Sequence, residues 1–132
     1  MGIKTSLFFR LRDIRLFFDR RDFEYKCGDF TINLPYNHDL RQNQIRHPKY
    51  DKFLPHLANY LPNHQFVVDV GANCGDTLSA MISANNNLKF LCIEPDKLFI
   101  KYLYKTISKI KKKLDCIIIV SKSLAGKQLK SV

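Results

Sequence analysis

The segment at residues 66–77, with the sequence FVVDVGANCGDT, constrains the fold of this chain more than any other. Five mostly apolar residues are followed by a turn of small residues, and then by polar residues suited to the start of a helix. A strand that is buried on both faces of a parallel sheet reads as a continuous apolar run. A glycine-rich turn directly after such a strand lets a ligand approach the backbone beside the positive end of the next helix. The segment therefore predicts a strand–loop–helix site of the nucleotide-binding type.

The rest of the C-terminal half alternates between strand patterns and helix patterns. Apolar runs at 66–70, 89–93 and 116–120 predict three strands, and amphipathic stretches at 76–84 and 97–113 predict the helices between them. This βαβαβ order predicts an α/β fold with a parallel sheet and right-handed crossovers.

Residues 3–22 have the pattern of an amphipathic helix. Arginines lie mostly off the apolar stripe, and such a basic helix can lie on a membrane surface. We favour packing of the stripe on the rest of the chain, and membrane-surface contact remains the alternative. The stripe consists of Leu7, Leu11, Ile14 and Phe18.

Residues 23–61 show shorter patterns. Segments 24–27 and 30–34 flank a Gly-Asp pair and predict a β-hairpin. Residues 35–48 show no period and predict a loop. An apolar stripe at 50–61 predicts two short helical pieces, and Pro55 begins the second, because proline suits a first turn and not a helix interior.

The length of 132 residues leaves room for one domain, and 45% hydrophobic residues are enough for a core. We divide the chain into residues 1–61, which hold the helix, the hairpin and a lead-in helical segment, and residues 62–132, which hold the cofactor-binding half of a Rossmann-like domain.

The chain carries 22 Lys and Arg against 12 Asp and Glu, a net charge of +10. From Lys101 onward there are nine lysines and one acid, Asp115. A basic face can bind nucleic acid or an anionic membrane. No aromatic–basic RNA-binding module accompanies the lysines, so we favour a solvated helix face and do not expect nucleic acid as a partner.

The four cysteines form no C-x-x-C pair, and two lie in apolar runs. Buried free thiols in a reducing compartment fit this usage, which favours a cytoplasmic location. The four histidines have no ligand spacing, so we predict no metal site. No apolar run approaches the roughly 20 residues of a membrane span.

Three acidic residues indicate which ligand the glycine turn accepts. Asp69 lies within the first strand, Asp76 begins the next helix, and Glu94 ends the second strand. A carboxylate in the position of Glu94 can accept both hydroxyls of a ribose. The other two acids would repel a dinucleotide pyrophosphate, whereas the sulfonium and ammonium of S-adenosylmethionine complement them. The glycine spacing D-x-G-x-x-x-G also departs from G-x-G-x-x-G, and no Walker A lysine follows.

A purely structural interpretation stays open for each of these residues. Gly71 and Gly75 can serve only to turn the chain, and Asp76 or Thr77 can cap the helix. Glu94 can be an ordinary loop acid before a proline. Because the residues fall together at the ends of successive strands, we favour a cofactor site.

At this level of detail the chain resembles the FkbM-type S-adenosylmethionine-dependent methyltransferases. Residues 68–77, VDVGANCGDT, are similar to the first motif of that family. The IEPD sequence at 93–96, followed by Phe99 and Leu103, is similar to its second motif, and residues 47–55 resemble its lead-in segment. The resemblance covers roughly residues 45–125. It implies a class I methyltransferase fold and O-methyl transfer, often to hydroxyls of sugars or small metabolites.

The resemblance also implies roles for individual residues. The loop residues would surround the methionine part of S-adenosylmethionine, Glu94 would hold the ribose, and residues 121–124 would lie near the adenine. No residue is assigned as a catalytic base. The candidate cofactor-binding residues are Asp69, Gly71, Ala72, Asn73, Gly75, Asp76, Thr77, Glu94, Pro95 and Ser123.

The chain departs from the family pattern in two places. Lys105-Thr106-Ile107 stands where the family has an Asn, so a contact on the helix surface is expected to be lost. The sequence also ends at Val132, before the part of this fold that holds the acceptor. We therefore expect an incomplete parallel sheet whose first strand is an edge, and self-association through that edge.

Three alternatives remain beside a methyltransferase acting on a sugar or small-molecule acceptor. The lysines of the C-terminal third suggest a basic nucleic-acid-binding, methyltransferase-like module. The glycine turn alone also fits a dinucleotide-dependent oxidoreductase. A noncatalytic partial Rossmann-like domain fits both the resemblance and the early end of the sequence.

Overall fold

A computed structural model describes residues 21–47, 49 and 51–122 of the chain. The helix predicted at 3–22 lies almost wholly outside the described residues, and so does Ser123. In the described part of the chain, no helix is long and apolar enough to cross a membrane.

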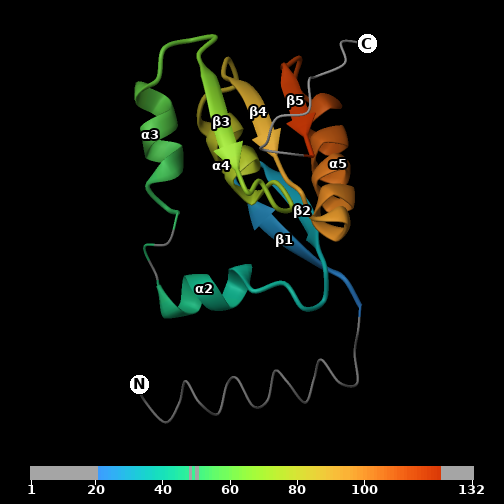
Figure 1. Ribbon diagram of the computed structural model, residues 1–132. Helices are drawn as coiled ribbons and strands as arrows, with labels where there is room; N and C mark the ends of the chain where they lie inside the picture. Colours follow the sequence, from blue (N-terminus) through green and yellow to red (C-terminus); the bar gives the residue numbers. More distant parts are fainter. Residues whose placement is uncertain (1–20, 48, 50, 123–132) are drawn as a thin grey trace.

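The described residues form five strands and four helices (Figure 1). In chain order they are β1 (Phe23–Cys27), β2 (Phe30–Leu34), α2 (Leu40–Arg46), α3 (Leu54–Tyr60), β3 (Phe66–Val70), α4 (Asp76–Ala84), β4 (Lys89–Ile93), α5 (Lys97–Lys111) and β5 (Ile118–Ser121).

The last three strands form a parallel sheet with the order β3-β4-β5. In register, Val68 lies beside Leu91, which lies beside Ile119. The α/β, Rossmann-like arrangement with an open sheet is therefore confirmed. The third strand was predicted at 116–120 and begins two residues later, at Ile118.

The sheet, its helices and the hairpin form three layers. β1 and β2 pair antiparallel, as predicted, and they pack on α4 and α5 rather than on the sheet. Helix α5 buries one broad face, which includes Tyr102 and Thr106 in addition to residues of the predicted stripe. One continuous core joins the layers, with Leu34 from the hairpin, Leu78 and Leu103 from the helices, and Phe90 from the sheet.

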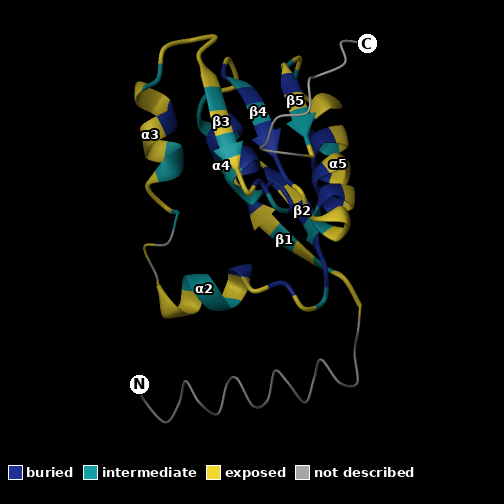
Figure 2. Ribbon diagram, viewed as in Figure 1, coloured by how far each residue is buried: buried dark blue, intermediate teal, exposed yellow. Residues whose placement is uncertain are grey.

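Within the described part of the chain, no helix or strand covers the opposite face of the sheet (Figure 2). Phe66, Val68 and Val70 of β3 are 48%, 57% and 57% exposed, and about half of Ile119 in β5 and of Ile117 just before it is exposed. The prediction that the first strand is buried on both faces is therefore wrong. The expectation that it is an edge strand is confirmed, because among the described strands β3 pairs with β4 alone.

Two upstream predictions need correction. Residues 35–48, predicted as a loop, contain α2, whose single buried residue is Leu40 and which therefore shows no apolar period. Pro55 lies in the first turn of α3, as predicted, but Leu57 and Tyr60 of the predicted stripe are exposed. Helix α3 packs sideways on α4, so only the small Ala58 is fully buried.

Candidate cofactor site

The loop after β3 is held by the end of β4. The backbone N–H groups of Gly71 and Ala72 both donate to the carbonyl of Ile93, at 2.8 and 3.1 Å. The N–H of Asn73 donates to Oε2 of Glu94 at 2.7 Å. Three successive donors of the loop are thus directed into the protein and not toward a ligand.

The second half of the loop is held by α5. Gly75 donates its N–H to the carbonyl of Ala72 at 2.8 Å, and the hydroxyl of Thr106 donates to the carbonyl of Cys74 at 2.7 Å. Thr106 is 1% exposed, and its hydroxyl joins α5 to the loop.

Three loop residues have left-handed backbone conformations, which explains part of the sequence. Gly71, Asn73 and Gly75 have φ values of 79°, 50° and 86°. Glycine adopts this region at little cost, and asparagine tolerates it better than most other residues. A side chain at Gly75 would also meet Thr106 at 3.0 Å and Leu103 at 3.1 Å, whereas nothing lies within 4 Å of a Cβ added at Gly71.

Glu94 joins the ends of the two strands. Its side chain is 5% exposed, and its second oxygen, Oε1, accepts the N–H of Asp96 at 2.8 Å. Asp96 in turn accepts the N–H groups of Leu98 and Phe99 and caps the start of α5. The carboxylate predicted to hold a ribose therefore also closes the loop in the structure, and its role toward a ribose stays a prediction.

Asp69 carries the clearest sign of a site built for a ligand. Burial, followed by the negative charges of Asp76, Asp51 and Glu94, raises its pKa to about 6. Its Oδ2 atom is buried and has no hydrogen-bond partner among the described residues. A buried carboxylate oxygen without a partner is costly, and a cationic ligand group would compensate it.

Asp76 is a second acid whose pKa is shifted by its surroundings. Burial raises its pKa, while backbone N–H groups at the start of α4 and the nearby His38 lower it. The N-cap residue is Gly75 and no side chain caps the helix, so the structural interpretation that Asp76 or Thr77 is the N-cap is wrong. The acid at the first position of α4 nevertheless offsets the positive end of the helix, which would otherwise attract an anion.

A cavity of about 360 Å³ lies over the loop. Of the predicted site residues it brings together Gly71, Asn73, Asp76 and Thr77. Asp69, Ala72, Gly75, Glu94 and Pro95 are not among its described lining residues. The remaining lining residues are Asn37, His38, Asp39, Leu40, Asn43, Asp51 and Phe99.

A second cavity, of about 230 Å³, lies beside the first. Asp51, Asp76 and Thr77 line both cavities, and the hairpin residues Tyr25 and Cys27 line the second. Asp51 and Asp76 therefore lie between the two cavities, one over the glycine loop and one against the hairpin.

Sequence reasoning missed two residues of this site. His38 belongs to a segment without a clear period, Asp51 lies at the start of a segment predicted as helical, and both are distant in sequence from the loop whose cavity they line. The sequence offers only a weak signal for His38. In the structure it is a buried residue of a turn, and its own N–H donates to the carbonyl of Pro35.

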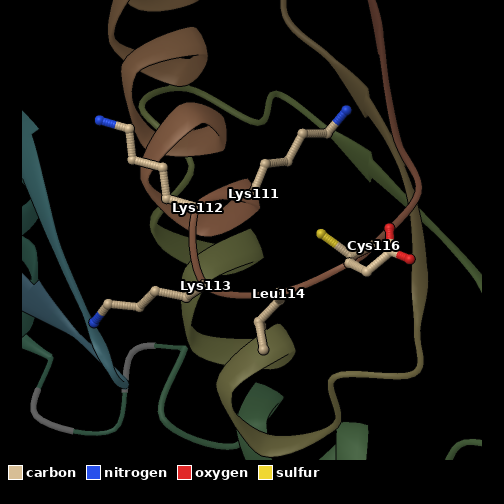
Figure 3. A pocket seen from close by; sticks show the side chains of 6 residues that line it. Lys111, Lys112, Lys113, Leu114 and Cys116 are labelled. Atoms are coloured by element: carbon tan, nitrogen blue, oxygen red, sulfur yellow. The ribbon is translucent and has the colours of Figure 1, made fainter.

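Three consecutive lysines, Lys111, Lys112 and Lys113, lie at the end of α5 and just after it. A cavity of about 390 Å³ lies there, and it is lined by Lys111 to Cys116. Figure 3 shows that the ammonium groups of Lys111, Lys112 and Lys113 point in different directions. This cavity precedes β5 and is therefore at the opposite end of the sheet from the glycine loop.

Comparisons with known proteins show remote structural likeness. No protein-family model matches the chain, and no curated protein matches it. Among solved structures, a protein-L-isoaspartate O-methyltransferase is similar with 9% identity and a TM-score of 0.42, over 81% of this chain and 30% of that one. The plantazolicin methyltransferase BpumL in complex with SAH is similar with 13% identity and a TM-score of 0.41, over 89% of this chain and 43% of that one. The chain spans less than half the length of either structure, so we argue its function from its own residues.

Proposed function

We propose that the loop at residues 71–77 binds S-adenosylmethionine. The observation that carries this proposal is the direction of the polar groups: the N–H groups of Gly71, Ala72 and Asn73 donate to Ile93 and Glu94, and two carboxylates, Asp51 and Asp76, line the cavity. A phosphate-binding loop has the opposite arrangement, with free N–H groups aimed at the anion. A ligand that is cationic and lacks phosphates fits these groups best.

The acids supply complementary charge for such a ligand. Asp76 and Asp51 line the cavity, and their charges act on Asp69, which has a buried oxygen without a hydrogen-bond partner among the described residues. Burial, and then the repulsion of the neighbouring acids, raises the pKa of Asp69, so a cation near these acids would offset part of the cost of its charge. S-Adenosylmethionine carries a sulfonium and an ammonium group, and the FkbM resemblance names the same cofactor.

We further propose that the bound group serves as a methyl donor for the hydroxyl of a sugar or small metabolite, the acceptor class that the resemblance implies. When bound, S-adenosylmethionine supplies an electrophilic methyl group. The chain's own contribution is to hold the donor in place and to provide a fixed electrostatic environment. No described side chain is assigned as the base for the acceptor.

Calorimetric titration of the full chain tests the binding proposal. We expect saturable binding of S-adenosylmethionine and of its demethylated product, and no binding of NADH. Asp76→Asn should weaken the binding of S-adenosylmethionine by about tenfold, because it removes one charge beside the ligand. Asp115→Asn is the matched control and should have no effect, since Asp115 is exposed at the other end of the sheet. Binding of NADH alone by the folded chain would contradict the proposal.

A further inference from the structure

One buried histidine outside the glycine loop contacts the loop directly. His38 lies in the turn between β2 and α2, and its ring packs edge-on against Phe99 with the ring centres 5.6 Å apart. Its Nε2 atom lies 2.8 Å from Oδ1 of Asn73. Both His38 and Asn73 line the cavity over the loop.

The second ring nitrogen determines which atom carries the proton. The backbone N–H of Leu40 donates to Nδ1 of His38 at 3.1 Å, so Nδ1 must be an acceptor. In the neutral ring the proton is then on Nε2. Nε2–H donates to Oδ1 of Asn73, and this bond fixes the orientation of the Asn73 amide.

Asn73 is therefore held at both ends. Its backbone N–H is bound by Glu94, and the oxygen of its side chain is bound by His38. The remaining group, Nδ2, has two N–H donors and no acceptor among the described residues. Because the N–H groups of Gly71, Ala72 and Asn73 are directed into the protein, Nδ2 is a donor that the loop retains for a ligand.

We propose that His38 is a positioning residue that presents Nδ2 of Asn73 to the carboxylate of the ligand's amino-acid end. The acids Asp51 and Asp76, on the same cavity wall, then complement the ammonium of that end. This inference rests on the proposed function. It adds which groups bind the carboxylate of the amino-acid end and which bind its ammonium.

The test compares two ligands that differ in this end alone. S-Adenosylhomocysteine has the amino-acid end, and methylthioadenosine lacks it. We expect His38→Phe, which keeps a ring but loses the hydrogen bond, to weaken binding of S-adenosylhomocysteine by about tenfold. Binding of methylthioadenosine should change by less than about twofold. His38→Gln can donate to Asn73 in the same way, so it should restore most of the lost affinity.

The controls separate this role from a purely structural one. His56→Ala removes an exposed histidine of α3 and should change neither affinity. An equal loss of both ligands in a folded H38F, or no loss of S-adenosylhomocysteine, would overturn the inference. If H38F does not fold, H38N replaces it, because its side chain is too short to reach Asn73. Wild-type chain that binds neither ligand would instead overturn the proposed function, and this inference with it.

Discussion

At the scale of single residues, the glycine loop shows that two identical residues can be required for different reasons. Gly71 and Gly75 both have left-handed backbones, with φ values of 79° and 86°. Gly75 is also packed under α5, so a side chain there would press on Thr106 and Leu103. Gly71 faces open space at the cavity. The first glycine thus keeps room for a ligand, and the second keeps room for a helix.

Alanine substitutions at these two positions form a matched pair. Gly71→Ala should lower the free energy of unfolding by about 1 kcal/mol, the cost of a strained backbone. Gly75→Ala should lower it by about 2–4 kcal/mol, because overpacking against α5 is added. Urea denaturation measures both values. Equal losses for the two variants would contradict the packing difference, and we expect Gly71→Ala to weaken cofactor binding more than it weakens the fold.

At the scale of elements, the site depends on the register between β3 and β4. Because the two strands are parallel and end together, the loop after β3 meets the residues after β4. The carboxylate of Glu94 accepts hydrogen bonds from the N–H groups of Asn73 and Asp96, and so joins the two segments. The acidic residue after the second strand therefore stabilises the loop in addition to any contact with a ribose.

Removal of the Glu94 carboxylate should destabilise the protein. We expect Glu94→Ala to lower the free energy of unfolding by about 2 kcal/mol, because it leaves two N–H groups without their charged acceptor. Glu24→Ala is the control: Glu24 is exposed and 4.0 Å from Lys109, so its loss should cost at most about 0.5 kcal/mol. Urea denaturation of both variants checks the difference, and similar values for the two would show that Glu94 does not hold the loop.

The elements were largely predictable because their signals are local. The bounds of β3, α4 and β4 coincide with the prediction, since Gly71 ends one strand and the asparagines at 85–87 end the helix. The candidate site residues of the loop were predicted from the same local pattern, in which glycines follow an apolar strand. The predictions that were wrong depend on packing between distant parts of the chain. The face of β3 that was predicted to be buried is exposed because no described helix packs against it. The bond between His38 and Asn73 joins residues 35 positions apart, and no spacing rule predicts it.

At the scale of the whole molecule, the described chain buries one face of its sheet and exposes the other. The exposed face includes Phe66, Val68 and Val70 of β3, and β3 is also an edge strand. An apolar edge strand of this kind is a template for pairing with another chain. The hairpin does not cover this edge, because it forms a separate sheet against α4 and α5.

We predict that the chain self-associates through this face. Size-exclusion chromatography with light scattering should show species larger than a monomer. Val68→Lys should shift them toward the monomer, because it places a charge at the centre of the edge. Tyr104→Lys is the control, since Tyr104 is similarly exposed but lies on α5. A monodisperse wild-type monomer whose β3 amides are fully protected in hydrogen exchange would contradict the prediction.

The acids of the site also affect the stability of the molecule. The pKa of Asp69 is raised in the folded chain to about 6, from 3.8. The folded state therefore binds this proton more tightly than the unfolded state, and stability declines as the pH rises from about 4 to 6. Asp69→Asn should raise the free energy of unfolding at pH 7, by roughly 1–2 kcal/mol after allowance for partial exposure.

The pH dependence of S-adenosylmethionine binding tests the central claim that carboxylates select a cationic ligand without phosphates. We propose that a bound cation is stabilised by the charge of Asp69, whose pKa is raised to about 6, mainly by burial. The affinity of the wild-type chain should fall by about tenfold between pH 7.5 and pH 5, and the dependence should be flattened in Asp69→Asn. Calorimetric titration at both pH values measures this. An affinity in the wild-type chain that does not change with pH, or that rises as the pH falls, would contradict the account.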